Sequence, residues 1–380
     1  MAAGVLAVLA LGLAIALHRA GDGEKSPFAG CPLRGPGAEL QSCYAQGLLS
    51  LMEERRSPRA ALAAVERVAR EDGGYLGANC HIIMHTVGRK YGAARSVTLA
   101  NMKDFLPKDN DPGCSAGFAH GLITHLAPDI DIAHPRRSAA VCRQAPNRYQ
   151  EYSCVHGFGH AVMRLYSDDL RPALRLCRRM GRRVAPDCAQ GAYHDYWFSV
   201  VGTDDTPRQR SAARTPRALC RRQPREFVRP CWYRAFIDTR PAGYQTKTAA
   251  DVLKPCADLA GIQRRGCITA TSVIGSSNPL KQFRVCASLP QEDILSCVFG
   301  VKSQNLLGTR EINMRRLISR CDWLGSDSRL SCYRWFGRTM SVITNGKFMR
   351  TGCPRLKAPD ARSACSEGAE RMDEALVTFS

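Results

Sequence analysis

The cysteines of this chain constrain its fold more than any other feature. There are 18 of them, and 16 form couples whose members stand 11 or 12 positions apart. The two left over are Cys80 and Cys114, and because the total is even we expect them to bridge each other. The couples are Cys31 with Cys43, Cys142 with Cys154, Cys177 with Cys188, Cys220 with Cys231, Cys256 with Cys267, Cys286 with Cys297, Cys321 with Cys332, and Cys353 with Cys365. The spacing therefore predicts nine disulfides and no free thiol.

The cysteines also mark a repeat. The second member of each couple, taken with Cys80 and Cys114, gives ten marks at intervals between 30 and 43 residues, with a mean near 36. Periods of this size are typical of two-helix units that bury their apolar sides against their neighbours. Apolar residues recur at helical spacing before the first cysteine of a couple, as in Asp169 to Met180. The sequence predicts an all-α protein of about ten disulfide-stapled two-helix repeats, stacked as a solenoid or closed α/α array.

Each couple is expected to tie the end of one helix to the start of the next. Residues able to cap a helix stand directly before several second cysteines, namely Ser153, Asp187, Ser296 and Ser331. These residues predict that the second helix of a repeat begins at its cysteine.

Four segments are expected along the chain. Residues 1–26 contain an apolar stretch, Ala2 to Leu17, that predicts a signal peptide or membrane anchor unless the start codon is misassigned. Residues 27–202 and 230–380 hold helical repeats with and without histidine, and the arginine- and proline-rich residues 203–229 are expected to form an irregular insertion between them. Export would place the chain in an oxidising compartment, secreted or membrane-anchored, where cysteines form disulfides.

The chain is strongly basic. It carries 54 basic and 34 acidic residues, a formal net charge of +20, and most of the basic residues are arginine. No basic run is interleaved with aromatics, so nucleic acid is not an expected partner. The charge fits either a solvated basic surface or one that binds an anionic envelope component.

The histidines are confined to one part of the chain. Apart from His18 they all lie between residues 81 and 194, and three of the repeats there share the pattern C-x-x-G-x-x-H. His85, His120, His160 and His194 follow one another at intervals of 35, 40 and 34 residues. They therefore occupy equivalent places on four successive helices, which stacking would bring together.

Two of these helices carry a second histidine. His81 precedes His85 by four residues, and His156 precedes His160 by four, so each pair lies on one helical face. Such pairs chelate metal ions, and helix axes 8 to 10 Å apart allow imidazoles from two helices to share an ion. The equivalent places elsewhere hold Leu49, Ile237, Val273, Ser303 and Arg338, so folding of the repeat does not require histidine.

These patterns predict a metal site formed by His81, His85, His120, His156, His160 and His194. Neutral imidazole suits zinc, copper or iron. Asp195 is the candidate catalytic base or orienting carboxylate, whereas Glu151 fits better as a helix-start acid. Asp129 and Asp131, with His125 and His134, are expected at a rim or lid. The competing interpretations are histidines satisfied between helices, and haem ligation without a C-x-x-C-H attachment motif.

Over residues 80–194 the motifs C-H-x-x-x-H, C-x-x-G-x-x-H-G and C-x-H-G-x-G-H resemble a group of uncharacterised exported bacterial proteins with paired cysteines. The resemblance implies a histidine constellation in a secreted setting and no particular reaction.

Two functions follow as hypotheses. The first is an extracytoplasmic metalloenzyme, an oxidoreductase or a hydrolase, acting on a small-molecule substrate. The second is a non-catalytic scaffold that sequesters metal or binds an envelope polyanion. Motifs such as H-E-x-x-H, G-x-S-x-G and the phosphate-binding glycine loops are missing from the sequence.

Overall fold

The structure is a computed structural model. It describes residues 28, 30–31, 37–55, 57–72, 75–107, 113–145, 148–199, 208–209, 216–239, 246–273, 279–305, 318–344 and 346–370. The predicted signal or anchor segment, 1–26, lies outside these residues. Within the described part no helix has both the length and the apolar character needed to cross a membrane.

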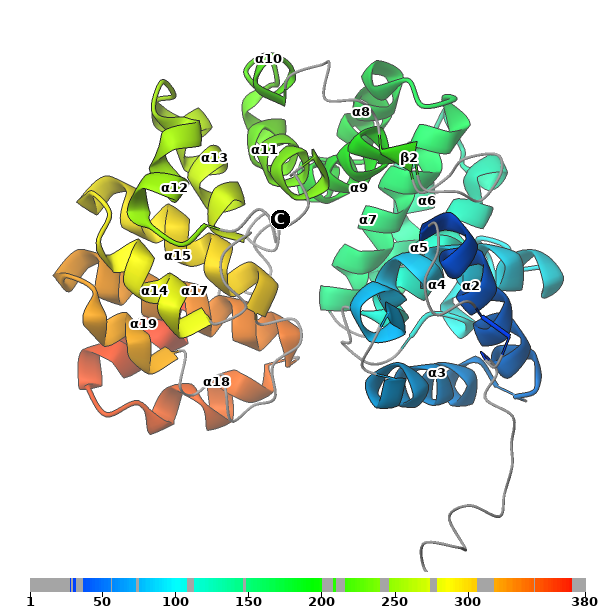
Figure 1. Ribbon diagram of the computed structural model, residues 1–380, viewed down its shortest axis with the longest axis horizontal. Coiled ribbons are helices and arrows are strands. Elements are labelled where there is room, and N and C mark those ends of the chain that lie inside the picture. Colours follow the sequence, from blue (N-terminus) through cyan, green and yellow to red (C-terminus); the bar gives the residue numbers. More distant parts are fainter. Residues whose placement is uncertain are drawn as a thin grey trace, which may run out of the picture.

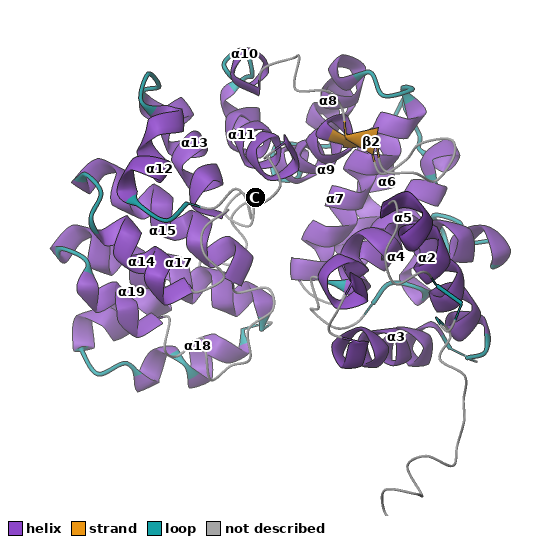
Figure 2. Cartoon of the chain, in the orientation of Figure 1, coloured by secondary structure: helices purple, strands orange, loops and turns teal. Residues whose placement is uncertain are grey.

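The protein is all-α, as predicted (Figure 2). A two-stranded antiparallel ladder between β1 (Phe198–Ser199) and β2 (Arg208–Gln209) is the exception among the described residues. The α-helices are α2 (Gly37–Glu53), α3 (Pro58–Asp72), α4 (Tyr75–Ala94), α5 (Cys114–His125), α6 (Pro135–Ala140), α7 (Arg148–Leu165), α8 (Leu170–Arg179), α9 (Ala185–Trp197), α10 (Pro216–Cys220), α11 (Arg225–Thr239), α12 (Ala249–Leu253), α13 (Gly261–Val273), α14 (Pro279–Ala287), α15 (Gln291–Asn305), α17 (Ser326–Ile343), α18 (Lys347–Thr351) and α19 (Pro359–Glu370).

The longer helices pack on one another in chain order. Contacts run from α4 to α5 and then through α7, α9, α11, α13, α15, α17 and α19, each helix touching the next. These helices follow an arc from the amino-terminal arm to the carboxy-terminal arm (Figure 1). The shorter helices α8, α10, α12 and α14 each pack against the long helix that follows them. The arc turns far enough for α17 to contact α7 as well.

All nine predicted disulfides are formed, and every cysteine is paired. The eight couples bond as their spacing predicts: Cys31 with Cys43, Cys142 with Cys154, Cys177 with Cys188, Cys220 with Cys231, Cys256 with Cys267, Cys286 with Cys297, Cys321 with Cys332, and Cys353 with Cys365. The ninth bond joins Cys80 to Cys114, also as predicted.

The disulfides fall into two kinds. A typical couple joins a short helix to the long helix after it, as Cys177 of α8 does to Cys188 of α9. The bond between Cys80 and Cys114 differs because it joins two successive long helices, α4 and α5. Nine disulfides indicate an oxidising, extracytoplasmic environment.

The predicted helix starts are wrong by several residues. Helix α7 begins at Arg148, α15 at Gln291 and α17 at Ser326, each six residues before its cysteine, which is Cys154, Cys297 and Cys332 in turn. Glycine or proline stands directly before α15 and α17, and α9 carries proline in its first turn, so these signals set the start. The predicted caps, Ser153, Asp187, Ser296 and Ser331, consequently lie inside helices.

The predicted irregular insertion, 203–229, is partly helical. Residues Pro216–Cys220 form α10, and α11 begins at Arg225. Two prolines of this stretch stand at or just before helix starts, because Pro216 is the first residue of α10 and Pro224 precedes α11. Residues 203–207 and 210–215 lie outside the described part of the chain.

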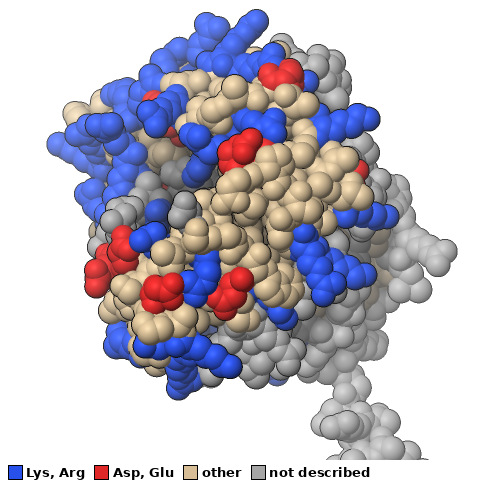
Figure 3. Space-filling model, turned by 90° about the vertical axis from the view of Figure 1, so that its left-hand side faces the viewer, with Lys and Arg blue, Asp and Glu red and all other residues tan. Residues whose placement is uncertain are grey.

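The aromatics beside two of the cysteines in the carboxy-terminal half are core residues. Trp232, Tyr333, Trp335 and Phe336 are all buried, whereas Trp323 of the same half is 39% exposed. Lysine and arginine side chains instead cover much of the outer face of this arm, where acidic side chains are fewer (Figure 3).

Candidate metal centre

Four consecutive helices bring all six predicted histidines together. His81 and His85 lie on α4, His120 on α5, His156 and His160 on α7, and His194 on α9. Neighbouring rings have their centroids between 4.6 and 6.0 Å apart. Residues separated by up to 113 positions therefore meet in one cluster, as the repeat alignment requires.

Glycines let these helices approach closely enough for the rings to meet. A Cβ placed on Gly117 of α5 would lie 2.0 Å from the backbone oxygen of His81, and a Cβ on Gly191 of α9 would lie 2.0 Å from that of His156. Such a distance is far shorter than any real contact, so a larger residue would force the helices apart. The glycine of the C-x-x-G-x-x-H pattern thus serves close helix packing.

Three ring nitrogens converge at the amino-terminal side of the cluster. Nε2 of His85 lies 3.3 Å from Nε2 of His81 and 3.2 Å from Nδ1 of His120. Nitrogens bound to a tetrahedral ion at about 2.0 to 2.1 Å would be separated by about 3.4 Å. The spacing of these nitrogens therefore suits a shared ion.

In three of the clustered rings one nitrogen is bonded to a residue outside the set of histidines. Nδ1 of His81 donates to the carbonyl of Gly113 at 3.2 Å, which leaves the Nε2 lone pair of the neutral ring facing the cluster. Nε2 of His120 lies 3.1 Å from Oγ of Ser153. Nδ1 of His160 lies 2.8 Å from Oδ1 of Asp195. Such outer partners fix the tautomer and ring orientation of metal-binding histidines.

Burial keeps most of these imidazoles neutral. His85, His120, His156 and His194 are at most 5% exposed, whereas His81 is partly exposed. Burial lowers the pKa of each of these four well below the ordinary value of 6.5, and neighbouring imidazoles lower it further. Burial also raises the pKa of Asp195, against the opposing attraction of His160. Neutral imidazole is the form that binds a metal ion.

Several buried ring nitrogens have no hydrogen-bond partner among the described residues. They are Nδ1 of His85, Nδ1 of His156 and Nε2 of His160. A buried polar atom without a partner costs free energy, which an ion would recover by taking the lone pair of Nδ1 of His156 or Nε2 of His160. His85 presents its other nitrogen, Nε2, to the cluster. Two sets of three histidines place one ligand atom each within 4.8 Å of one another, the first being His81, His85 and His120 and the second His120, His156 and His160. The residues present therefore fit a transition-metal site.

The predicted rim residues do not join the cluster. His134 is 59% exposed and bonds to Asp131 at 3.1 Å, in the segment between α5 and α6. The side chain of His125 lies against Gly92. Glu151 lies in the first turn of α7, as expected, and pairs with Arg183 at 2.6 Å. Of the described groups that could hold a metal, none includes these residues.

Two residues near the cluster were not predicted to belong to it. Ser153 was expected as a cap but bonds to His120 from within α7. Arg234 of α11 lies close enough for its charge to lower the pKa of His194, after the larger effect of burial. Arg234 stands three residues after Cys231, where the preceding repeat has Gly191. Alignment of these repeats would have indicated that its side chain approaches the histidines.

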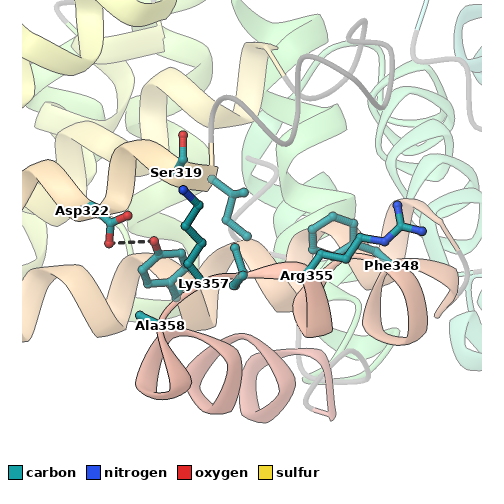
Figure 4. A pocket seen from close by; sticks show the side chains of 10 residues that line it. Ser319, Asp322, Phe348, Arg355, Lys357 and Ala358 are labelled. Carbon is teal, nitrogen blue, oxygen red and sulfur yellow. Dashed lines mark hydrogen bonds between the residues drawn. The ribbon is translucent and has the colours of Figure 1, made fainter.

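A separate pocket of about 360 Å³ lies in the carboxy-terminal arm (Figure 4). Lys357 and Ser319 line it, and the hydroxyl of Tyr333 donates to Oδ1 of Asp322 at 2.9 Å. Asp322 also accepts from Nε of Arg329 at 2.8 Å, so the acidic group of the pocket is already paired. The pocket belongs to different helices from those of the histidine cluster.

Comparison with models of protein families, with curated protein sequences and with solved structures found no match.

Proposed function

We propose that this chain is a metalloprotein of an oxidising, extracytoplasmic compartment whose buried histidine cluster binds transition-metal ions. One observation carries the proposal: four helices direct six imidazoles to one place, where two sets of three can each present ligand atoms within 4.8 Å. Hydrogen bonds join His85 to His81 and to His120, but they leave Nδ1 of His156 and Nε2 of His160 without a described partner, and a metal ion would satisfy these nitrogens.

Copper is the first candidate among the metals that imidazole binds. Every cysteine is in a disulfide, so thiolate is not a ligand. The ligand atoms are imidazole nitrogens, and the carboxylate of Asp195 bonds to the other nitrogen of His160. Affinity for such donors rises along the divalent series to copper and falls again at zinc.

The depth of the site favours redox chemistry over hydrolysis. His160 is fully buried and Asp195 is 1% exposed, so a polymer or large ester could not reach their side chains without local opening. Only small reactants or an electron reach such a place readily. A bound copper ion would supply one-electron oxidation and reduction. His81, the partly exposed member, marks the side from which a small reactant would enter.

The residues of the chain have distinct parts in this proposal. The imidazoles bind the metal and exclude water from it. Asp195 is a positioning residue, because it holds the proton of His160 on Nδ1 and leaves Nε2 for the cluster. Ser153 does the same for His120 by fixing the proton on Nε2.

The proposal is tested with the full chain produced in an oxidising compartment and stripped of metal by chelator. We expect the protein to retain copper after gel filtration, and its reduced, loaded form to consume dioxygen. His85→Ala, at the centre of the cluster, should lose most of both properties, whereas the matched surface variant His134→Ala should keep them. Equal metal content in the two variants would contradict the assigned site, and copper retained without oxygen consumption would indicate storage instead of catalysis.

A further inference from the structure

The histidine cluster is built twice along the chain. Each half consists of two histidines four residues apart on one long helix and a single histidine on the next long helix of the stack. The first half is His81, His85 and His120, and the second is His156, His160 and His194. Corresponding members are separated by 75, 75 and 74 residues. Two repeats thus separate the halves, and the pattern of ligands is the same in both.

The backbone packing is duplicated in the same register. In the first half Gly117 of α5 lies against the carbonyl of His81 on α4, and in the second half Gly191 of α9 lies against the carbonyl of His156 on α7. In each case the glycine stands three residues before the single histidine. Each pair of helices therefore crosses at the same point and carries its three histidines at equivalent positions.

The cluster is too wide for one ion. Metal–nitrogen bonds are about 2.0 to 2.1 Å long, so even opposite ligands of one ion lie within about 4.2 Å of each other. Among the described residues no more than three histidines place their ligand atoms within 4.8 Å of one another, in two sets that share His120, so the six rings cannot all bind one ion. A single ion would leave buried imidazole nitrogens without a partner.

Hydrogen bonding decides to which half His120 belongs. Its Nδ1 faces Nε2 of His85 at 3.2 Å, and its Nε2 is taken by the hydroxyl of Ser153. His120 therefore serves the first half. In the second half His194 holds the place that corresponds to His120, whose ring lies beside His156 and His160 in the structure. The ring centroid of His194 lies 5.0 Å from that of His160 and 5.9 Å from that of His156, whereas the ring of His120 lies 5.1 Å from those of both His85 and His81.

We propose that the cluster is a dinuclear centre, with one ion held by His81, His85 and His120 and a second held by His156, His160 and His194. The inference rests on the proposed metal-binding function and extends it. The two halves meet where the rings of His85 and His160 lie 4.8 Å apart, so the two ions are close neighbours.

Charge favours cuprous copper as the occupant. The six imidazoles are neutral ligands, and Asp195 is the carboxylate bonded directly to one of them. Two divalent ions at a given separation repel each other about four times as strongly as two monovalent ions. A nearby arginine, Arg234, adds to the unfavourable potential for cations. Two cuprous ions therefore fit this buried site with the least repulsion.

The test is metal stoichiometry. The metal-free full chain is loaded anaerobically with cuprous copper in the presence of a competing chelator and passed over a desalting column, and copper per chain is measured by elemental analysis. The variants are His120→Gln in the first half, His194→Gln in the second, and the exposed His134→Gln as matched control. Circular dichroism and the urea midpoint of each metal-free variant verify that it is folded.

We expect two copper ions per wild-type chain and per His134→Gln chain, and one in each of the other variants. One ion in the wild-type protein would overturn the dinuclear centre and leave the proposed function standing, whereas none would remove both. Two ions retained by both His120→Gln and His194→Gln would overturn the assignment of the two halves. The wild-type count decides the main point without reliance on any variant.

Discussion

Nδ1 of His160 and Oδ1 of Asp195 lie 2.8 Å apart, and both side chains are almost completely buried. The pair joins α7 to α9 inside the histidine cluster. A carboxylate in this position accepts the Nδ1 proton of the imidazole and leaves Nε2 for a metal. The relationship makes Asp195 a positioning residue and yields the first prediction.

Asp195→Asn should weaken copper binding by about 10- to 100-fold, the range typical for loss of such an outer partner. An asparagine amide can donate to Nδ1 of His160, which would move the ring proton to Nε2 and block the lone pair. The measurement is a competition titration against a chelator of known affinity. Asp131→Asn, which changes the exposed partner of His134, serves as control. Equal affinities in the two variants would show that Asp195 does not orient a ligand.

Gly191→Ala should destabilise the protein and disturb the second half of the cluster. The new Cβ would lie 2.0 Å from the backbone oxygen of His156, so α7 and α9 must separate. Overpacking of this kind costs about 1 to 3 kcal/mol, which exceeds the gain of up to about 1 kcal/mol in helix propensity. Urea unfolding of the metal-free protein measures the change. Gly30→Ala, where a Cβ meets nothing within 4 Å, should leave stability unaltered.

Acid should destabilise the metal-free protein from about pH 6.5 downward. In the folded state burial holds the pKa of His85, His120, His156 and His194 well below 6.5, so these rings stay neutral. In the unfolded state they take up protons near their ordinary pKa. The unfolded chain then binds more protons than the folded one, and the free energy of unfolding falls by about 1.4 kcal/mol per pH unit for each such group.

The check is the urea midpoint of the metal-free protein measured about one pH unit above and one below the ordinary histidine pKa. A lower midpoint at the acid pH is expected, and replacement of all four histidines by glutamine should reduce the difference. A midpoint independent of pH would mean that the buried rings are protonated in the folded state.

Loss of the disulfide between Cys80 and Cys114 should impair metal binding more than loss of an ordinary couple. This bond fixes α4 to α5, the helices that carry His81, His85 and His120. The double variant with Cys80→Ala and Cys114→Ala should lose about 4 kcal/mol of stability by the loop-entropy relation and bind one copper ion fewer.

The matched double variant combines Cys353→Ala and Cys365→Ala in the carboxy-terminal arm, where the closed loop is shorter. Its expected loss is about 3 kcal/mol, with metal content unchanged. Equal metal content in the two double variants would show that the first bond does not support the site.

The sequence was sufficient to predict what depends on the repeat. The even spacing of the cysteines predicted every disulfide, and the alignment of His85, His120, His160 and His194 predicted their convergence. Both succeed because a regular stack turns equivalent sequence positions into neighbours in space. The glycine of the shared pattern, at Gly117 and Gly191, lets neighbouring helices touch in the structure.

Two kinds of feature were not predicted from the sequence: the residue at which a helix begins, and the partner that a polar side chain finds. Serine is a residue type that often caps the start of a helix, but α7 begins before Ser153. The hydroxyl of Ser153 bonds to His120 instead. His134 lies between His120 and His156 in the sequence, but its side chain bonds to Asp131 at the surface. The charge of Arg234 acts on His194 from the next repeat, and only an alignment of the repeats would have indicated this.

The contact between α17 and α7 gives the histidine-free half of the chain a part in the site. Because α7 carries both His156 and His160, the carboxy-terminal arm supports the position of this helix through the contact with α17. Sequence changes near the carboxy terminus can therefore alter the rigidity of ligands some 180 residues away, and the conformational freedom of the second half of the cluster depends on whether the arc is closed.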